Sequence, residues 1–214
     1  MWCMPNDMPT RSYKEKNTMK LDLVFAGVGG QGVVVLSDIF CEAAILDGFD
    51  VTKAEIHGMA QRGGSIVAYA KISEKIQTPL IETGKADALI GFEILETTRT
   101  LPMLKQNGTV IVNTKHIPPN TTTSKNTKQK TATQLLEIIK SQTPNVHEVD
   151  GSGIAKQVGN NLVVNTVLLG ALSALPEMPI KQDSFKQAMT NRLNEKYLQI
   201  NLQSFELGRQ SVLK

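Results

Sequence analysis

The sequence predicts an α/β fold in three layers, a mostly parallel twisted sheet with helices on both faces, Rossmann-like in plan. Short apolar runs typical of buried strands alternate with segments of helical spacing as far as residue 114, and this alternation favours a parallel sheet. A glycine-rich turn joins the first apolar run to the first amphipathic segment. Residues 162–175 are apolar almost all round, which predicts a helix buried in a core or an interface.

The size of the chain suits one globular domain. It has 214 residues, of which 41% are hydrophobic and 20% charged. Residues 1–18 are polar, contain two prolines and show no periodicity, so we expect a disordered or partner-binding arm. We expect residues 19–214 to form a single domain.

The elements of the first half follow from local pattern. Apolar positions repeat every three or four residues between 31 and 47, which predicts a helix that Gly48 ends. A second helix begins at Ile94 and is bent or ended by Pro102. The apolar or alternating runs predict strands over residues 20–27, 51–56, 66–73, 86–93 and 108–114.

The second half begins with an exposed loop over 115–133, rich in Thr and Lys. A helix over 134–141 and a short strand over 145–150 follow. The apolar helix 162–175 ends before two prolines. Asp183 is expected to cap a last helical region, which Gly208 closes.

Composition excludes several function classes. The net charge is only +3, and aromatics make up 5% of residues and are not interleaved with lysines, so we expect no nucleic-acid binding. The two cysteines cannot supply four thiolates to an iron–sulfur cluster. His116 and His147 are isolated, so no metal site is expected. No apolar stretch is long enough to span a bilayer and no signal peptide is recognisable, so we expect a cytoplasmic protein without a membrane partner.

The glycine-rich turn is the first candidate site. A strand that turns on glycines into a helix presents free N–H groups and the positive end of a helix dipole to an anion. Gly27, Gly29 and Gly32 also fit the dinucleotide pattern G-x-G-x-x-G, although Glu55 stands late for a ribose contact. The alternative is that the glycines serve only a tight turn and close helix packing.

The second candidate is the loop HGMAQRGGS, residues 57–65, expected at the carboxyl end of a strand. Arg62 could hold a phosphate or carboxylate, and His57 could transfer a proton. The alternative is that both only tie the loop down or contact a partner subunit.

Two further polar features have structural explanations. Glu93 and Glu96 could act as paired carboxylates, but charges favoured by the dipole at a helix start explain them better. Asn165, in the apolar helix, is expected to be hydrogen-bonded to a cap or a neighbouring element.

Taken together, these motifs resemble the gamma-type subunit or domain of the 2-oxoacid:ferredoxin oxidoreductases, most of all the small (beta) subunits of the indolepyruvate enzymes. The resemblance runs from about residue 20 to residue 209. It is carried by GVGGQGVVVLSDIF (27–40), EIHGMAQRGGSIVAYAKI (55–72), ADALIGFEILETTR (86–99), GTVIVNT (108–114), DGSGIAKQVGNNLVVNTVLLGALSAL (150–175) and NLQSFELGR (201–209).

The resemblance implies the oxidative decarboxylation of a 2-oxoacid such as indolepyruvate. Coenzyme A takes the acyl group and ferredoxin takes the electrons, with thiamine diphosphate, Mg²⁺ and iron–sulfur clusters as cofactors. This sequence has neither cluster cysteines nor a G-D-G…N-N segment. We therefore expect an accessory subunit in a hetero-oligomer, with those cofactors on a larger partner chain and no activity alone. No residue is assigned a catalytic role. The motif residues expected near a ligand or partner are Gly27, Gly29, Gly30, Gln31, Gly32, His57, Gln61, Arg62, Gly63 and Gly64.

Two other functions compete with this interpretation. A self-sufficient nucleotide-dependent oxidoreductase would bind NAD or NADP through Gly29 and Glu55. A non-enzymatic module would use the glycine loop to bind a phosphorylated metabolite.

Overall fold

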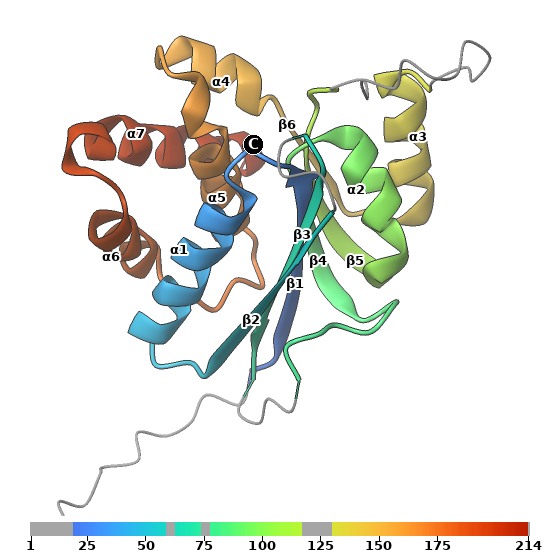
Figure 1. Ribbon diagram of the computed structural model, residues 1–214, viewed down its shortest axis with the longest axis horizontal. Helices are drawn as coiled ribbons and strands as arrows, with labels where there is room; N and C mark the ends of the chain where they lie inside the picture. Colours follow the sequence, from blue (N-terminus) through green and yellow to red (C-terminus); the bar gives the residue numbers. More distant parts are fainter. Residues whose placement is uncertain (1–18, 59–62, 74–77, 117–129, 214) are drawn as a thin grey trace, which may run out of the picture.

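The computed structural model describes residues 19–58, 63–73, 78–116 and 130–213. A six-stranded sheet lies between two layers of helices (Figure 1), which confirms the predicted α/β class. The expectations for the arm 1–18 and for most of the loop 115–133 lie outside the described residues. The strands are β1 (Leu21–Val28), β2 (Val51–His57), β3 (Ser65–Ile72), β4 (Ala86–Gly91), β5 (Leu104–Asn113) and β6 (Val146–Val149). The helices are α1 (Val33–Leu46), α2 (Ile94–Thr100), α3 (Ala132–Gln142), α4 (Gly151–Gln157), α5 (Val164–Ser173), α6 (Gln182–Arg192) and α7 (Glu195–Val212).

The strand order is β2-β3-β1-β4-β5-β6. The neighbouring pairs β1–β4, β4–β5 and β5–β6 are parallel, whereas β3 runs antiparallel to both β1 and β2. The connection between β2 and β3 is too short for a crossover helix, so these two strands can only form a hairpin. The hairpin places β3, the antiparallel strand, between β1 and β2, so that β2 forms an edge of the sheet.

The two faces of the sheet carry separate cores. Helices α1, α5, α6 and α7 cover one face, and α2 and α3 cover the other (Figure 1). A row of tilted aromatic rings links β1 to three of the helices on the first face. The ring centroids are 5.9 Å apart from Phe25 to Phe40, 6.3 Å from Phe40 to Phe185 and 6.0 Å from Phe185 to Phe205. Such offset pairs add to the free energy gained from burial.

Helix α5 is the apolar helix expected from the sequence. Its residues from Thr166 to Ser173 are all buried, and they belong to the core of this domain rather than to an exposed face. A 3₁₀ turn, Asn161–Val163, leads into it. Of the two environments that the apolar pattern allowed, the core is therefore the one observed.

Helices α5 and α7 cross at two glycines. A Cβ atom added to Gly208 would lie 2.8 Å from the carbonyl carbon of Val167, and one added to Gly170 would lie 2.8 Å from that of Phe205. Each added Cβ would lie even closer to the carbonyl oxygen of the same residue. Backbone thus packs on backbone at this crossing, and a methyl group at either glycine would force the helices apart.

The C-terminal region differs from the sequence-based expectation. It contains two helices, with a break at Leu193 and Asn194, where Asn194 caps α7. Gly208 lies inside α7 and does not end it, because its place is set by the crossing with α5. The expected cap, Asp183, lies in the first turn of α6, and Lys181 occupies the N-cap position.

Two further elements were misjudged from the sequence. Helix α4 was not predicted; the Asp150 side chain caps it by accepting from the Gly153 N–H at 2.8 Å. Strand β5 begins at Leu104, earlier than expected, because Pro102 confines the end of α2 to a single 3₁₀ turn. Both departures concern short segments with weak periodicity.

Candidate functional site

The two candidate loops meet at the carboxyl edge of the sheet. The Gly29 N–H donates to the Gly64 carbonyl oxygen at 2.9 Å, and Val28 pairs with Ser65 across the β1–β3 ladder. The loop after β1 also lies at the switch point of the sheet. Helix α1 returns to one side of the sheet and α2 to the other, and open α/β sheets bind ligands at such points.

The glycines of the first loop have different tasks. Gly32 is the N-cap of α1 with φ of 81°, a left-handed conformation that suits glycine. Gly27 is buried, and an added Cβ would lie 2.8 Å from Phe92 Cβ and 2.9 Å from Val33 Cγ2. Packing therefore explains Gly27, whereas Gly32 leaves the start of α1 without a capping side chain.

Gln31 turns inward and holds the loop. Its Oε1 accepts from the Val28 N–H at 2.7 Å, and its Nε2 reaches the Phe92 carbonyl oxygen at 3.5 Å. The side chain thus ties the end of β1 to the end of β4. Gln31 positions the loop.

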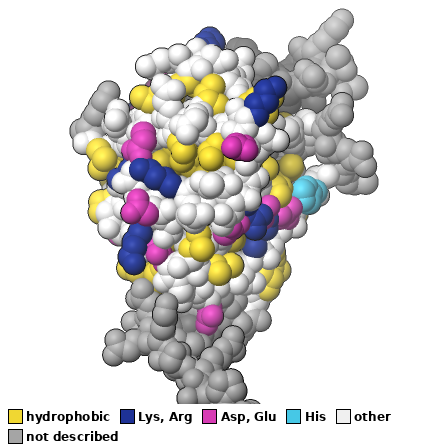
Figure 2. Space-filling model, turned by 90° about the vertical axis from the view of Figure 1, so that its left-hand side faces the viewer, with side chains coloured by type: hydrophobic (Ala, Val, Ile, Leu, Met, Phe, Trp, Pro, Cys, Tyr) yellow, Lys and Arg dark blue, Asp and Glu magenta, His cyan; other side chains and the backbone are white. Residues whose placement is uncertain are grey.

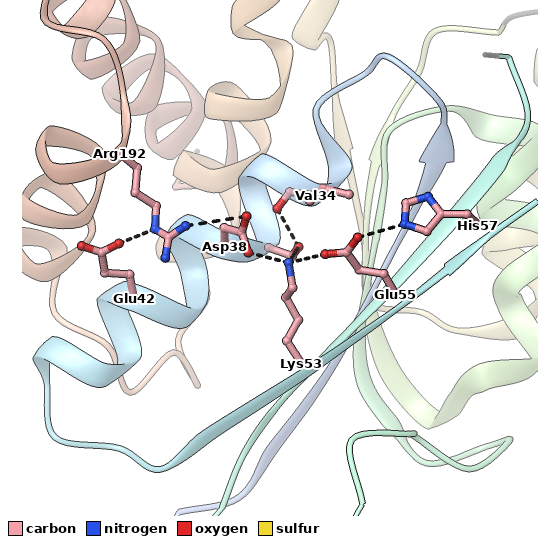
Figure 3. Close-up of polar contacts among 8 residues, drawn as sticks. Val34, Asp38, Glu42, Lys53, Glu55, His57 and Arg192 are labelled. Atoms are coloured by element: carbon pink, nitrogen blue, oxygen red, sulfur yellow. Dashed lines mark hydrogen bonds and ion pairs between the residues drawn. The ribbon is translucent and has the colours of Figure 1, made fainter. Parts of the chain in front are cut away.

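His57 belongs to a row of charged side chains that runs from β2 across α1 to α6 (Figure 3). His57 Nε2 lies 2.9 Å from Glu55 Oε2, and Glu55 Oε1 lies 2.5 Å from Lys53 Nζ. Lys53 also pairs with Asp38, which lies 3.7 Å from Arg192. The imidazole is about half exposed and contacts a carboxylate of its own strand, so its expected contact with a ligand or a partner stays a prediction.

This row of charges shifts two pKa values. The hydrogen bond from Lys53 lowers the pKa of Glu55, and the contact with His57 adds to the effect. Partial burial acts to lower the pKa of Lys53, but hydrogen bonds to Asp38 and Glu55 outweigh the effect of burial, and the pKa of Lys53 is raised. Glu55 is therefore engaged in ion pairs on an edge strand, with β3 between it and β1. A ribose-binding acid would be expected on the strand beside β1, so the dinucleotide interpretation is disfavoured.

The lowered pKa of Glu55 makes stability depend on pH. A carboxyl group whose pKa is lower in the folded than in the unfolded protein stabilises the fold at pH values above its unfolded-state pKa, here 4.5. This contribution to stability is lost as the pH falls through the pKa of the folded state. We expect Glu55→Gln to flatten the fall in unfolding free energy below pH 4.5. Urea denaturation at a series of pH values measures this. An unchanged slope in the variant would contradict the assigned ion pairs.

The second loop is described only in part. Gly63 has φ of 74°, and Gly64 makes the contact with Gly29. Gln61 and Arg62 lie outside the described residues, so their expected ligand or partner contacts remain predictions.

Glu93 and Glu96 occupy the start of α2, which confirms their interpretation as helix-start charges. Glu93 is the N-cap, and its Oε2 accepts from the Glu96 N–H at 2.9 Å. Glu96 pairs with Arg99 at 2.5 Å. His116, which looks isolated in the sequence, lies 3.1 Å from buried Glu93 through its Nδ1. No local pattern predicts that contact, since 23 positions separate the two residues.

Beside the glycine loop lies a cavity of about 190 Å³ that sequence reasoning missed. Asn113, the last residue of β5, lines it and is 1% exposed. Its Nδ2 donates to the Phe92 carbonyl oxygen at 3.0 Å, and its buried Oδ1 accepts no hydrogen bond from any described residue. The sequence contained one indication of this site, since Asn113 is a polar residue at the end of an apolar strand, where open α/β sheets bind ligands. The cavity is lined by Gly30, Gln31, Gly32, Asn113, Lys115, Asn161, Leu162 and Val164.

Asn165 closes the glycine loop from the side of α5. A Cβ added to Gly32 would lie 2.8 Å from Asn165 Nδ2, so the amide packs directly on the cap of α1. Its Oδ1 accepts from the Thr166 N–H at 2.9 Å. This bond joins neighbouring residues within the first turn of α5, so it is neither the cap nor the bond to another element that the sequence led us to expect.

The described ranges contain neither a candidate metal site nor a helix that could span a membrane. Among those residues, no three His, Cys, Asp or Glu side chains gather as a group that could hold a metal ion. None of the described helices combines the length and apolar character that crossing a bilayer requires. On the face in Figure 2, acidic and basic side chains are interspersed. Lys186 of α6 and Glu206 of α7 form an ion pair at 2.8 Å.

The fold is that of solved gamma subunits of keto-acid:ferredoxin oxidoreductases. The keto/oxoacid ferredoxin oxidoreductase gamma subunit from Geobacter sulfurreducens superposes with a TM-score of 0.66 at 24% identity, over 90% of this chain and 98% of that one. A 2-oxoglutarate:ferredoxin oxidoreductase chain from Magnetococcus marinus gives 0.70 at 19% identity, over 92% of this chain and 32% of that longer chain.

The family model for pyruvate ferredoxin/flavodoxin oxidoreductase matches residues 22–211, and this chain belongs to that family. Indolepyruvate oxidoreductase subunit IorB of Archaeoglobus fulgidus is 35% identical over 190 residues, which cover 89% of this chain and 94% of that protein. The common gamma subunit of the pyruvate/ketoisovalerate oxidoreductases of Pyrococcus abyssi is 28% identical, over 87% of this chain and 96% of its own length. The family resemblance inferred from the motifs is thereby confirmed.

Proposed function

We propose that this chain is the accessory subunit of a 2-oxoacid:ferredoxin oxidoreductase that acts on indolepyruvate or a related aryl pyruvate. The observation that carries the proposal is the match to indolepyruvate oxidoreductase subunit IorB, which extends over 94% of that protein. The match covers nearly the whole of both chains, so this chain has the size of a complete subunit of such an enzyme. The lower identity to the pyruvate/ketoisovalerate gamma subunits favours the indolepyruvate assignment.

The reaction would be divided between two chains. The 2-oxoacid and coenzyme A give an acyl-coenzyme A, carbon dioxide and one proton, and two electrons pass to ferredoxin. Only Cys3 and Cys41 could supply thiolates from this chain, and an iron–sulfur cluster usually requires four. Burial raises the pKa of Cys41 to about 12, which opposes the thiolate form that ligates metals. The clusters, thiamine diphosphate and Mg²⁺ would therefore be held by a larger partner chain in a cytoplasmic hetero-oligomer.

The carboxyl edge supplies this chain's part in the complex. The glycine loop and the loop after β2 are joined by the Gly29–Gly64 hydrogen bond, so they form one continuous surface. Leu162 is 81% exposed, and it lines the cavity beside that surface. We place the ligand or the partner chain against this edge, where it would shape access for the acyl acceptor.

Co-purification tests the proposal. The tagged full chain, co-expressed with a large thiamine-dependent subunit of an indolepyruvate oxidoreductase, is expected to elute with it from a size-exclusion column. The large subunit of a pyruvate oxidoreductase, offered in parallel, is expected to be bound less or not at all. Elution as a free monomer beside every large subunit would contradict the proposal.

A further inference from the structure

The outer edge of β2 is unpaired in the part of the chain that the structure describes. Strand β2 ends the sheet there, with β3 as its one neighbour (Figure 1). Free N–H and C=O groups at such an edge pair readily with another strand, and proteins commonly prevent this with a proline, a β-bulge or charges that repel. From Val51 to His57, β2 has no proline, and its register with β3 runs without a shift. The edge is therefore open to a second strand.

The hydrogen bonds to β3 show which backbone groups of β2 point outward. In an antiparallel ladder, every second residue directs both its N–H and its C=O toward the neighbouring strand. The Ser73 N–H donates to the Asp50 carbonyl oxygen at 3.3 Å. The Gly58 N–H donates to the Ser65 carbonyl oxygen at 2.9 Å, in the same register as the β2–β3 ladder. Even-numbered residues of β2 therefore face β3. The outward groups belong to the odd-numbered residues, Val51, Lys53, Glu55 and His57.

Charge selects one register for pairing with a second copy of this strand. An antiparallel pair that joins outward-pointing residues has its two-fold axis at a single residue. An axis at Lys53 or at Glu55 would place two like charges directly opposite, which destabilises a sheet. An axis at Ala54 places Lys53 of each copy opposite Glu55 of the other. Because Ala54 is the middle residue of β2, this register also pairs the strand over its whole length.

Side chains on both faces of β2 suit this register. Lys53 and Glu55 lie on the face that α1 covers, where Figure 3 shows them side by side. On the other face Ile56 is 50% exposed, and Thr52 of the second copy would cover part of its apolar surface. Ala54 would meet its own counterpart, and a small side chain fits a pair whose Cα atoms are about 4.5 Å apart.

The helices leave room for a second copy. Helix α1 contacts β1, β2 and β3, so its axis lies near the middle strand of the three, β3. Three strand spacings, about 14 Å, would then separate the α1 helices of the two copies. Helices that pack directly are about 8–10 Å apart, so the two α1 helices would not collide.

We propose that two copies of this chain join through their β2 strands, antiparallel about a two-fold axis at Ala54, to form one continuous sheet. A contact through a single strand is small, so the dimer should dissociate on dilution. Strands β1 and β2 run in the same direction, since both are antiparallel to β3, and the carboxyl edges of the two sheets therefore lie at opposite ends of the dimer. The pairing concerns this chain alone and does not depend on the proposed oxidoreductase partner.

A disulfide across the two-fold axis tests the register. Cysteines introduced at position 54 of both copies would lie about 4.5 Å apart at Cα, within the range that a disulfide spans. In a Cys3→Ser background, Ala54→Cys is expected to give a covalent dimer under mild oxidation. Thr52→Cys, on the same face of the strand, is the matched control, because about four residues, roughly 13 Å, would separate the two positions along the strands. Burial raises the pKa of Cys41 to about 12, so Cys41 contributes little thiolate in either variant.

Charge variants test the same pairing in solution. Analytical ultracentrifugation of the full chain is expected to show an equilibrium between monomer and dimer. Lys53→Glu and Glu55→Lys should each raise the dimer dissociation constant about tenfold or more, because each change places like charges opposite one another at both pairs. An equimolar mixture of the two variants restores opposite charges at both pairs and should form a mixed dimer. A variant that had only unfolded would not be rescued by mixing.

Several results would overturn the proposal. A native chain that stays monomeric up to high micromolar concentration would remove the interface. Equal crosslinking of Ala54→Cys and Thr52→Cys would exclude the register. A mixture of the charge variants that is as dissociated as each variant alone would exclude the charge pairs. A dimer that neither charge change weakens would show that the two copies meet through another surface.

Discussion

Gly208→Ala is expected to destabilise the fold by about 3 kcal/mol, although alanine favours helices by about 1 kcal/mol over glycine. The added methyl would overlap the backbone of Val167 on α5, and a carbonyl held in a helix cannot turn away as a side chain would. The helices must separate, and overpacking of this kind typically costs about 1–3 kcal/mol, occasionally more. For a chain of this length the melting temperature should fall by roughly 6–12 °C.

Urea denaturation of Gly208→Ala measures the effect, and two variants frame it. Gly170→Ala, on the facing helix, should cost a similar amount because its methyl would meet the backbone of Phe205. Gln203→Ala, at an exposed position of α7, should leave stability unchanged within about 0.5 kcal/mol. If Gly208→Ala proved as stable as the native protein, the close crossing of α5 and α7 would be wrong.

Leu168→Ala is expected to cost about 2–5 kcal/mol, the range for truncation of a fully buried leucine. Leu168 is 0% exposed and belongs to the core between the sheet and the helices. The loss would appear in the isolated chain as a lower urea midpoint with an unchanged slope.

The same variant separates a core role from an interface role. Leu162 offers the comparison, since it is 81% exposed beside the glycine loop. Leu162→Ala should leave the stability of the isolated chain unchanged and weaken its association with the large subunit. The assignment of α5 to the core would fail if Leu168→Ala left the isolated chain stable and weakened only assembly.

Local pattern predicted most of the strands and helices because their burial repeats with the period of the element. Strand β1 is a short apolar run buried in the centre of the sheet, and α1 buries one face of a regular amphipathic pattern. The pattern failed where tertiary contacts decide. Gly208 resembles a helix end in the sequence, yet it lies within α7 because α5 presses against it. The place of β3 between β1 and β2 is equally invisible to local pattern.

The candidate site was predicted in part for the same reason. Both loops were expected at the carboxyl edge, and the Gly29–Gly64 hydrogen bond joins them there. The contact between His116 and Glu93 and the cavity at Asn113 were missed, since each brings together residues far apart in the chain. The sequence does not show whether the Gln31 side chain binds a ligand or holds the loop. The structure shows that it folds back and accepts a hydrogen bond from the Val28 N–H.

The most direct test of the proposed function is reconstitution of activity. The full chain and a large thiamine-dependent subunit are assayed separately and together, without oxygen, with indolepyruvate, coenzyme A and a dye that accepts electrons. The account predicts reduction of the dye only when both chains are present, with acyl-coenzyme A formed in step with it. Equal activity of the large subunit with and without this chain, in a mixture shown to contain no complex, would contradict the accessory-subunit assignment.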